Sequence, residues 1–323
     1  MTKKEILDSL ELPLVAAPMF IISQTQLVLE CCKNGILGTF PALNNRSTEG
    51  FEEWVIEIKD GIKKHEAETG KKAAPYGVNL IVHRTNPRLE KDLEVVVRQK
   101  VPVVVTSLGA VSDLVDEVHS YGGLVFHDVI NTRHAQKAID AGVDGLILVC
   151  AGAGGHAGTH NPIPFVTEVR KMFDGVILLS GALSNGRDIA TALQMGADLA
   201  YMGTRFINTN EAIASEDYQN MIIESGTSDI VYTASISGVN GNYLKGSLEA
   251  AGITKEIWET KAKIDFGKLE AGSDVKAWKN VWGAGQGVAT IHDRLPASEL
   301  INRMKIEFQK ALRSQAQLLD RYS

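Results

Sequence analysis

The sequence predicts an α/β protein built as a (β/α)8 barrel with an appended, mostly helical C-terminal lobe. Eight short apolar runs alternate with amphipathic stretches between residues 12 and 225. The runs are nearly continuous in Val, Ile and Leu, which is typical of parallel strands covered by helices on both faces. No G-x-G-x-x-G sequence follows the first run, which disfavours the alternative, an open doubly wound sheet.

The elements are expected in strict alternation. The expected strands are Leu12–Ala17, Gly35–Phe40, Tyr76–Val82, Pro102–Ser107, Gly123–Asp128, Gly145–Cys150, Val176–Ser180 and Leu199–Gly203. The expected helices are Thr25–Lys33, Gly50–Lys64, Arg88–Gln99, Ser112–Tyr121, Thr132–Ala141, Pro164–Phe173, Arg187–Met195 and Glu216–Ser225. We therefore assign residues 1–225 to the barrel. Residues 226–323 are assigned to a helical lobe that covers the barrel mouth and ends in a helix from Ser298 to about Leu319.

Composition excludes several classes of function. Charged residues make up 22% of the 323 residues and the net charge is −6, without a concentrated basic stretch. This argues against a nucleic-acid or anionic-membrane surface. No run of 18 uncharged apolar residues is present, so no membrane span is expected. The three cysteines have no CxxC spacing, and the first residues lack the apolar core of a secretory signal, so we expect a cytoplasmic protein.

The most informative stretch is LILVCAGAGGHAGTH, from Leu146 to His160. An apolar run ends in a glycine-rich turn, where the backbone can approach a ligand closely because glycine has no Cβ. His156 lies in this turn and titrates near neutrality, so it is a candidate proton acceptor or donor. The alternative is a flexible loop with solvated histidines. A zinc site formed with His160 is disfavoured, because neither a helix nor a glutamate accompanies the pair.

Other polar residues stand where strands are expected to end. Pro18 stops the first strand and leaves backbone donors beyond it. Asn79 lies amid apolar neighbours and needs a partner, because an unsatisfied buried amide costs about 1–3 kcal/mol. His127 and Asp128 end the fifth strand, which places two titratable groups at the same rim.

The seventh and eighth strands end in two similar turns, Ser180-Gly181-Ala182 and Gly203-Thr204. The loops after these two strands of (β/α)8 barrels commonly bind phosphate through backbone N–H groups. Arg205 follows the second turn, and it either pairs with the phosphate or forms a salt bridge on the barrel.

Taken together, these motifs resemble the nitronate monooxygenase family of FMN-dependent TIM barrels. The resemblance rests on Pro18-Met19, Gly77-Val78-Asn79, Gly154-Gly155-His156-Ala157-Gly158, Ser180-Gly181-Ala182 and Met202-Gly203-Thr204-Arg205-Phe206, and continues more loosely through Trp282–Gly287. It implies that FMN is the cofactor and that His156 is the catalytic base. The cofactor-binding residues that it implies are Pro18, Met19, Phe20, Asn79, Asp128, Gly155, Ser180, Gly181, Ala182, Gly203 and Thr204.

Two departures from the family pattern bear on this site. Relatives often carry a second glycine where this chain has Ala182, which is compatible with backbone donation if its φ is negative. Some relatives carry a lysine at Asp128, where a carboxylate near the flavin would disfavour an anionic reduced ring. Either Asp128 points elsewhere or the redox tuning differs, and His127 is a candidate for the missing donor.

The resemblance leads to three hypotheses. In the first, the enzyme oxidises alkyl nitronates or nitroalkanes with O2. In the second, NAD(P)H reduces FMN on the same barrel, and a quinone or an enoyl thioester accepts the hydride. In the third, the barrel is a non-catalytic sensor of a phosphorylated metabolite. The sequence leaves the oligomeric state open, with a homodimer as one alternative.

Overall fold

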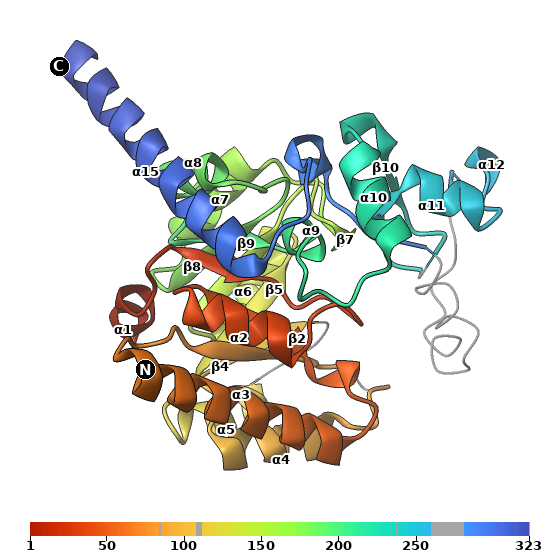
Figure 1. The fold of residues 1–323 in the computed structure, drawn as a ribbon. Coiled ribbons are helices and arrows are strands. Elements are labelled where there is room, and N and C mark those ends of the chain that lie inside the picture. The colour runs from red at the N-terminus through yellow and green to blue at the C-terminus, as the bar shows by residue number, and fades with distance from the viewer. Residues whose placement is uncertain (84, 108–111, 237, 260–280, 323) are drawn as a thin grey trace.

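The computed structural model describes the chain except residues 84, 108–111, 237, 260–280 and 323. Eight parallel strands close into a barrel in the order β1-β2-β3-β4-β5-β6-β8-β9 (Figure 1). Their bounds are β1 Leu14–Ala16, β2 Leu37–Pro41, β3 Tyr76–Ile81, β4 Val103–Ser107, β5 Leu124–Val129, β6 Gly145–Val149, β8 Val176–Ser180 and β9 Leu199–Met202. The predicted (β/α)8 barrel is confirmed, and the strand limits differ from the predicted ones by at most two residues.

Seven helices of the outer ring follow the first seven barrel strands. They are α2 Thr25–Lys33, α3 Thr48–Thr69, α4 Leu89–Gln99, α5 Ser112–His119, α6 Thr132–Asp140, α7 Pro162–Arg170 and α8 Gly186–Gln194. Local capping sets several of their starts. Asn131 and Asn185, for example, each accept a hydrogen bond from an N–H of the first turn.

Strand side chains alternate between two apolar clusters, as the pleat of a strand requires. In β5, Leu124 and Phe126 belong to the cluster inside the barrel, whereas Val125 and Val129 face the helices. The same alternation holds for β8 and β9 and fixes which polar residues point inward. These are the residues at the strand ends that form the candidate site.

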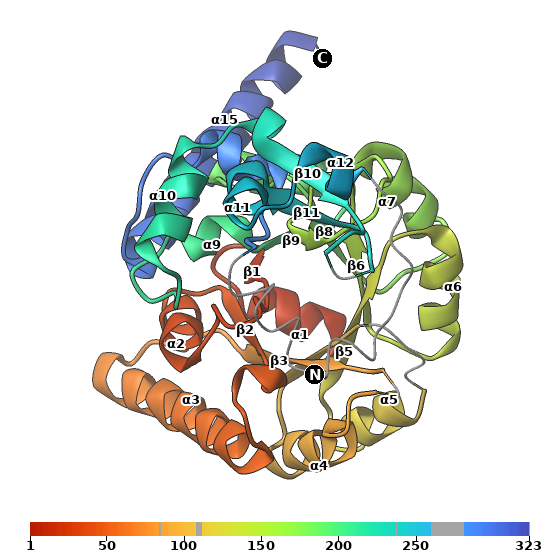
Figure 2. The same ribbon diagram turned by 90° about the vertical axis from the view of Figure 1, so that its right-hand side faces the viewer.

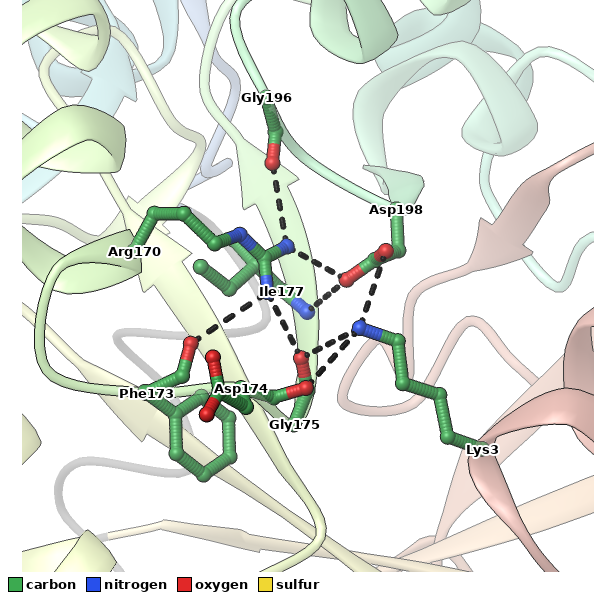
Figure 3. Close-up of polar contacts among 8 residues, drawn as sticks. All are labelled: Lys3, Arg170, Phe173, Asp174, Gly175, Ile177, Gly196 and Asp198. Atoms are coloured by element: carbon green, nitrogen blue, oxygen red, sulfur yellow. Dashed lines mark hydrogen bonds and ion pairs between the residues drawn. The ribbon is translucent and has the colours of Figure 1, made fainter.

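The N-terminal end of the barrel is closed by a short helix, α1 Lys3–Asp8, which is visible in the middle of the ring of strands in Figure 2. Its Ile6 is fully buried with the inner cluster. Lys3 reaches Asp198 at 3.2 Å and the carbonyl of Gly175 at 3.0 Å (Figure 3). This helix therefore acts as an apolar plug held by an ion pair.

Two aspartates at this end have the same structural task. Asp198 Oδ2 accepts the N–H of Ile177 at 2.8 Å and pairs with Arg170 (Figure 3). Asp144 Oδ2 accepts the N–H of Val125, also at 2.8 Å. Each carboxylate thus caps the N–H group of the second residue of a neighbouring strand, which explains why a Gly-x-Asp pattern precedes two strands in the sequence.

The C-terminal helix α15, Ala297–Tyr322, packs against α8 and α2 on the outside of the barrel. Its expected position over the barrel mouth is therefore wrong. It occupies the place of the eighth ring helix, because α10, Glu216–Glu224, lies at the mouth end instead (Figure 1). Leu300, Ile301 and Met304 are fully buried in the barrel's outer core. The division of the chain at residue 225 into two domains stays a prediction.

The remaining elements gather at the mouth end, opposite α1 (Figure 1). They are η1 Ala42–Asn44, α9 Thr204–Ile207, η2 Thr227–Asp229, β10 Ile230–Thr233, β11 Gly241–Leu244, α11 Lys245–Ala250, α12 Lys255–Trp258 and η3 Gln286–Thr290. β11 is the central strand of a three-stranded sheet, between β10 and β7, Gly155–His156. Within the described residues, no helix has the length and apolar character needed to cross a bilayer.

Candidate functional site

The two predicted phosphate turns lie side by side. Ser180 of β8 pairs in register with Tyr201 of β9, so the turns that follow leave adjacent strands at the same rim. Gly181 has φ +137° and Ala182 has φ +58°. The negative φ that we assumed for Ala182 is therefore wrong. The alanine adopts a left-handed conformation, which glycine can occupy without strain.

These turns present backbone donors. In the described structure, the N–H groups of Gly181, Ala182, Gly203 and Thr204 have no hydrogen bond to a protein acceptor. A run of backbone N–H groups with left-handed residues forms a concave anion site. The atoms nearest to a methyl group added at Gly203 would be side-chain atoms of Met19 and Ala17, at 3.6–3.7 Å. The backbone there is open to a ligand, and the residues fit a phosphate group.

The histidine loop is held by the small sheet at the mouth. Gly155 and His156 form β7, which pairs antiparallel with Asn242 and Gly241 of β11. The Asn242 side chain donates to the carbonyl of Ala153 at 2.6 Å and is buried. The loop therefore has a defined backbone path, which disfavours the alternative of a flexible turn.

Glycine is required at this contact for two reasons. Gly155 has φ +67°, and a Cβ added there would meet no atom within 4 Å, so the residue borders open space. A Cβ on Gly241 would instead stand 2.8 Å from the carbonyl oxygen of Gly155. The first glycine leaves room for a ligand, and the second permits the close approach of the two strands.

The start of η3, together with Gly285 before it, joins the histidine loop to the phosphate turns. The N–H of Gly285 donates to Oγ1 of Thr204 at 3.0 Å, and the N–H of Gln286 donates to the carbonyl of Gly152 at 2.9 Å. Ser184, after the first turn, donates to the carbonyl of Gly287 at 3.0 Å. This segment lies more than 80 residues from the turns that it braces, and in the sequence it was indicated by its glycine-rich composition and by the looser family resemblance through Trp282–Gly287.

The His156 side chain is exposed at the mouth, yet the protein around it reduces its solvation. This desolvation lowers the pKa of the imidazole below its ordinary 6.5. The neutral form, which accepts a proton, is therefore favoured near pH 7. His160 stands at the end of the same loop, where its ring packs on Phe165 with centroids 5.1 Å apart.

Three of the expected cofactor residues share the inward face of the barrel. By strand alternation Asn79, Asp128 and Ser180 all point inward near the mouth. Asn79 Nδ2 donates to the carbonyl of Val105 at 3.2 Å, which supplies the partner that a buried amide needs. Burial raises the pKa of Asp128 to about 7, and its Oδ1 has no partner in the described part of the chain.

The structure corrects the expectation for His127 and decides between the two alternatives for Arg205. His127 faces the helices, where its Nδ1 lies 2.8 Å from Oγ1 of Thr106, so it does not supply a donor inside the barrel. Burial lowers the pKa of His127 to about 4. Arg205 is buried and pairs with Asp293 at 2.6 Å, which favours the salt bridge over the phosphate contact.

The loop after β1 is fixed by a residue that sequence reasoning missed. Asn44 donates to the carbonyl of Met19 at 3.0 Å and accepts the N–H of Ile21 at 2.8 Å. Ile21 has φ +68°, an unusual conformation for a β-branched residue. Phe20 is 45% exposed at this rim, beyond Pro18. The loop is thus held in one conformation and presents apolar side chains at the mouth.

The aromatic residues of the C-terminal part mainly pack. Tyr243 is fully buried, and Trp282 stacks on Tyr218 with ring centroids 5.0 Å apart. Trp278 lies outside the described residues. No cluster of three or more His, Cys, Asp or Glu side chains with metal-binding geometry occurs among the described residues.

The fold and the site define a (β/α)8-barrel enzyme with two adjacent turns that present free backbone N–H groups and a histidine at the mouth. The sequence profile of the nitronate monooxygenase family matches residues 2–307, and the chain belongs to this family. It is therefore an oxidoreductase of a flavin-dependent family.

Similar proteins include enzymes with different names. A nitronate monooxygenase of Paraburkholderia phytofirmans is 24% identical, with 93% of each chain covered. The (3aS,4S,5R,7aS)-5-hydroxy-7a-methyl-1-oxo-octahydro-1H-indene-4-carboxyl-CoA dehydrogenase of Rhodococcus jostii is 25% identical over 87% of this chain and 76% of that protein.

Solved structures confirm the fold. FabK from Thermotoga maritima superimposes with a TM-score of 0.80 at 21% identity, covering 98% of this chain and 99% of that one. Nitroalkane oxidase from Streptomyces ansochromogenes gives a TM-score of 0.77 at 22% identity, with coverage of 95% and 99%.

Proposed function

We propose that this protein is an FMN-dependent nitronate monooxygenase, which oxidises alkyl nitronates or nitroalkanes with O2. The observation that carries the proposal is the pair of hydrogen bonds that connects the second phosphate turn to the histidine loop. Gly285 and Gln286 bond the second phosphate turn and the histidine loop through adjacent N–H groups. A ligand held by its phosphate at these turns would extend toward His156.

The residues present fit FMN. The N–H groups of Gly181, Ala182, Gly203 and Thr204 would hold the phosphate, with Ser180 beneath them. The ring would lie along the backbone of Pro18, Met19 and Phe20, pass Gly155 closely and meet Asn79 and Asp128 at its polar edge. FMN, when bound, supplies the electron acceptor and the site of reaction with O2.

His156 has a proton-transfer role in this proposal. Its neutral imidazole accepts the proton from the carbon next to the nitro group of a neutral nitroalkane. The imidazolium so formed then stabilises the negative charge of the nitronate. Because the pKa of His156 is lowered, activity on neutral nitroalkanes is expected to fall only when the pH drops below 6.5.

Two variants of the same loop test this role. His156→Asn is expected to keep FMN and nitronate turnover but to lose at least about 100-fold in kcat/KM on neutral nitroalkanes, the usual contribution of a general base. His160→Asn is the matched control, and we expect it to retain both activities. Equal loss on both substrates in His156→Asn would contradict the assignment of a base.

Anaerobic flavin reduction separates this proposal from the alternative. Rapid bleaching of the flavin by an alkyl nitronate supports the monooxygenase. Rapid bleaching by NADH or NADPH, with no reaction of nitronate, favours an NAD(P)H-dependent reductase of quinones or enoyl thioesters. A purified protein with no flavin absorption would overturn both.

A further inference from the structure

Asp128 has an unusual environment for a carboxyl group. It occupies the last inward-facing position of β5, in register with Ile147 of β6. The inward neighbours on the flanking strands include the apolar Val105 on β4 and Val149 on β6, and Ser107, the last residue of β4, follows Val105 on the same face. The residue keeps some exposed surface, but its Oδ1 is enclosed and has no hydrogen-bond partner in the described part of the chain.

No cation in the described structure compensates this carboxyl group. Desolvation is the cause of its raised pKa, about 7, and no basic side chain contributes. The titratable group that interacts with it is Tyr201, an inward-facing phenol of β9 whose own pKa is raised by burial and by the charge of Asp128. His127 on the same strand faces the opposite side.

An enclosed carboxyl oxygen without a partner calls for an explanation, because native proteins pair nearly all such groups. A ligand at the barrel mouth supplies one. A neutral carboxyl group donates a hydrogen bond, whereas a carboxylate repels the acceptor atoms of a ring edge. The orphaned oxygen, its inward direction and the mainly apolar surroundings all favour the neutral form.

We propose that Asp128 binds the flavin as a protonated carboxyl group that donates a hydrogen bond to an acceptor on the polar edge of the ring. It is thus a positioning residue that makes flavin binding depend on pH, in place of the lysine that some relatives carry. This inference rests on the proposed function, because it assumes that FMN occupies the mouth.

Linkage sets the direction of the pH effect. Binding that needs the protonated form weakens when the pH rises above the pKa of the free protein, by about tenfold for each pH unit. Titration of the FMN phosphate and of His156 also changes binding, but equally in all variants. The informative quantity is therefore the ratio of the dissociation constant of a variant to that of the wild type at each pH.

The experiment measures FMN dissociation constants by quenching of flavin fluorescence at pH 6, 7, 8 and 9. Asp128→Asn keeps a donor but cannot ionise, so its binding is expected to exceed that of the wild type by about tenfold or more at pH 9 and to match it within a few-fold at pH 6. Tyr201→Phe is the control, and its pH profile is expected to follow that of the wild type.

A second measurement does not depend on FMN. The apoprotein of Asp128→Asn is expected to resist urea better than the wild type at pH 9, because only the wild type must ionise a buried carboxyl group, and this gain is expected to shrink as the pH falls from about 7 toward the ordinary Asp pKa of 3.8. A constant ratio of FMN dissociation constants from pH 6 to pH 9 would overturn the proposal. Absence of FMN binding at every pH, with the stability difference intact, would instead refute the proposed function.

Discussion

Ala182 stores backbone strain in the first phosphate turn, and Ala182→Gly should release it. An L-residue in the left-handed region costs roughly 1–2 kcal/mol, and Ala182 sits there with φ +58°. Glycine raises the entropy of the unfolded chain, which offsets about 0.4–1 kcal/mol of that gain. The methyl group is exposed, so its removal costs little packing. We therefore expect the free energy of unfolding to rise by about 0.5–1 kcal/mol.

Urea denaturation is the assay of choice for this variant. For a chain of 323 residues, the unfolding entropy per residue makes 1 kcal/mol correspond to a shift in Tm of only about 1–2 °C. Ala151→Gly is the matched control, because Ala151 is also exposed in a turn at the mouth but has no positive φ. That variant should lose about 0.4–1 kcal/mol. Equal destabilisation of both variants would refute the assignment of strain to Ala182.

Two further predictions test the braces at opposite ends of the barrel. Gly285→Ala places a methyl group 2.5 Å from the carbonyl oxygen of Gly152, so we expect about 1–3 kcal/mol of destabilisation and weaker FMN binding in a fluorescence titration. The control is Gly226→Ala, whose added methyl group would meet its nearest atom at 3.8 Å. Equal FMN affinity in the two variants would count against the proposed link between the second phosphate turn and the histidine loop. Asp198→Ala removes two ion pairs and a strand cap, so urea unfolding should show a loss of about 2–4 kcal/mol with FMN affinity unchanged. The exposed Asp8→Ala should lose less than about 1 kcal/mol, and a comparable loss in both would contradict the capping role.

Much of the fold was predictable because strand burial is a local signal. A parallel strand inside a barrel must be apolar on both faces, so its position shows in six or so consecutive residues. The ends of the strands, and with them the two phosphate turns and the histidine loop, follow from that pattern. The site residues were therefore predicted from their place after a strand and from the family resemblance.

Direction and long-range contact were not predictable in this way. The sequence places His127 and Asp128 at one rim, but only the register of β5 shows that one faces the helices and the other faces the barrel interior. The φ of Ala182 depends on the path of the turn that contains it. Asn44 is an ordinary polar residue in the sequence, and its role appears only when the loop after β1 meets it.

The place of the C-terminal helix shows the same division. Its amphipathic pattern determined that residues near 298–319 form a helix with one apolar face. Which surface that face covers was decided by the barrel, because the ring has a gap between α8 and α2 that the helix after β9 leaves open. Periodicity in a sequence specifies that an apolar face exists, whereas the partner of that face depends on elements far away in the chain.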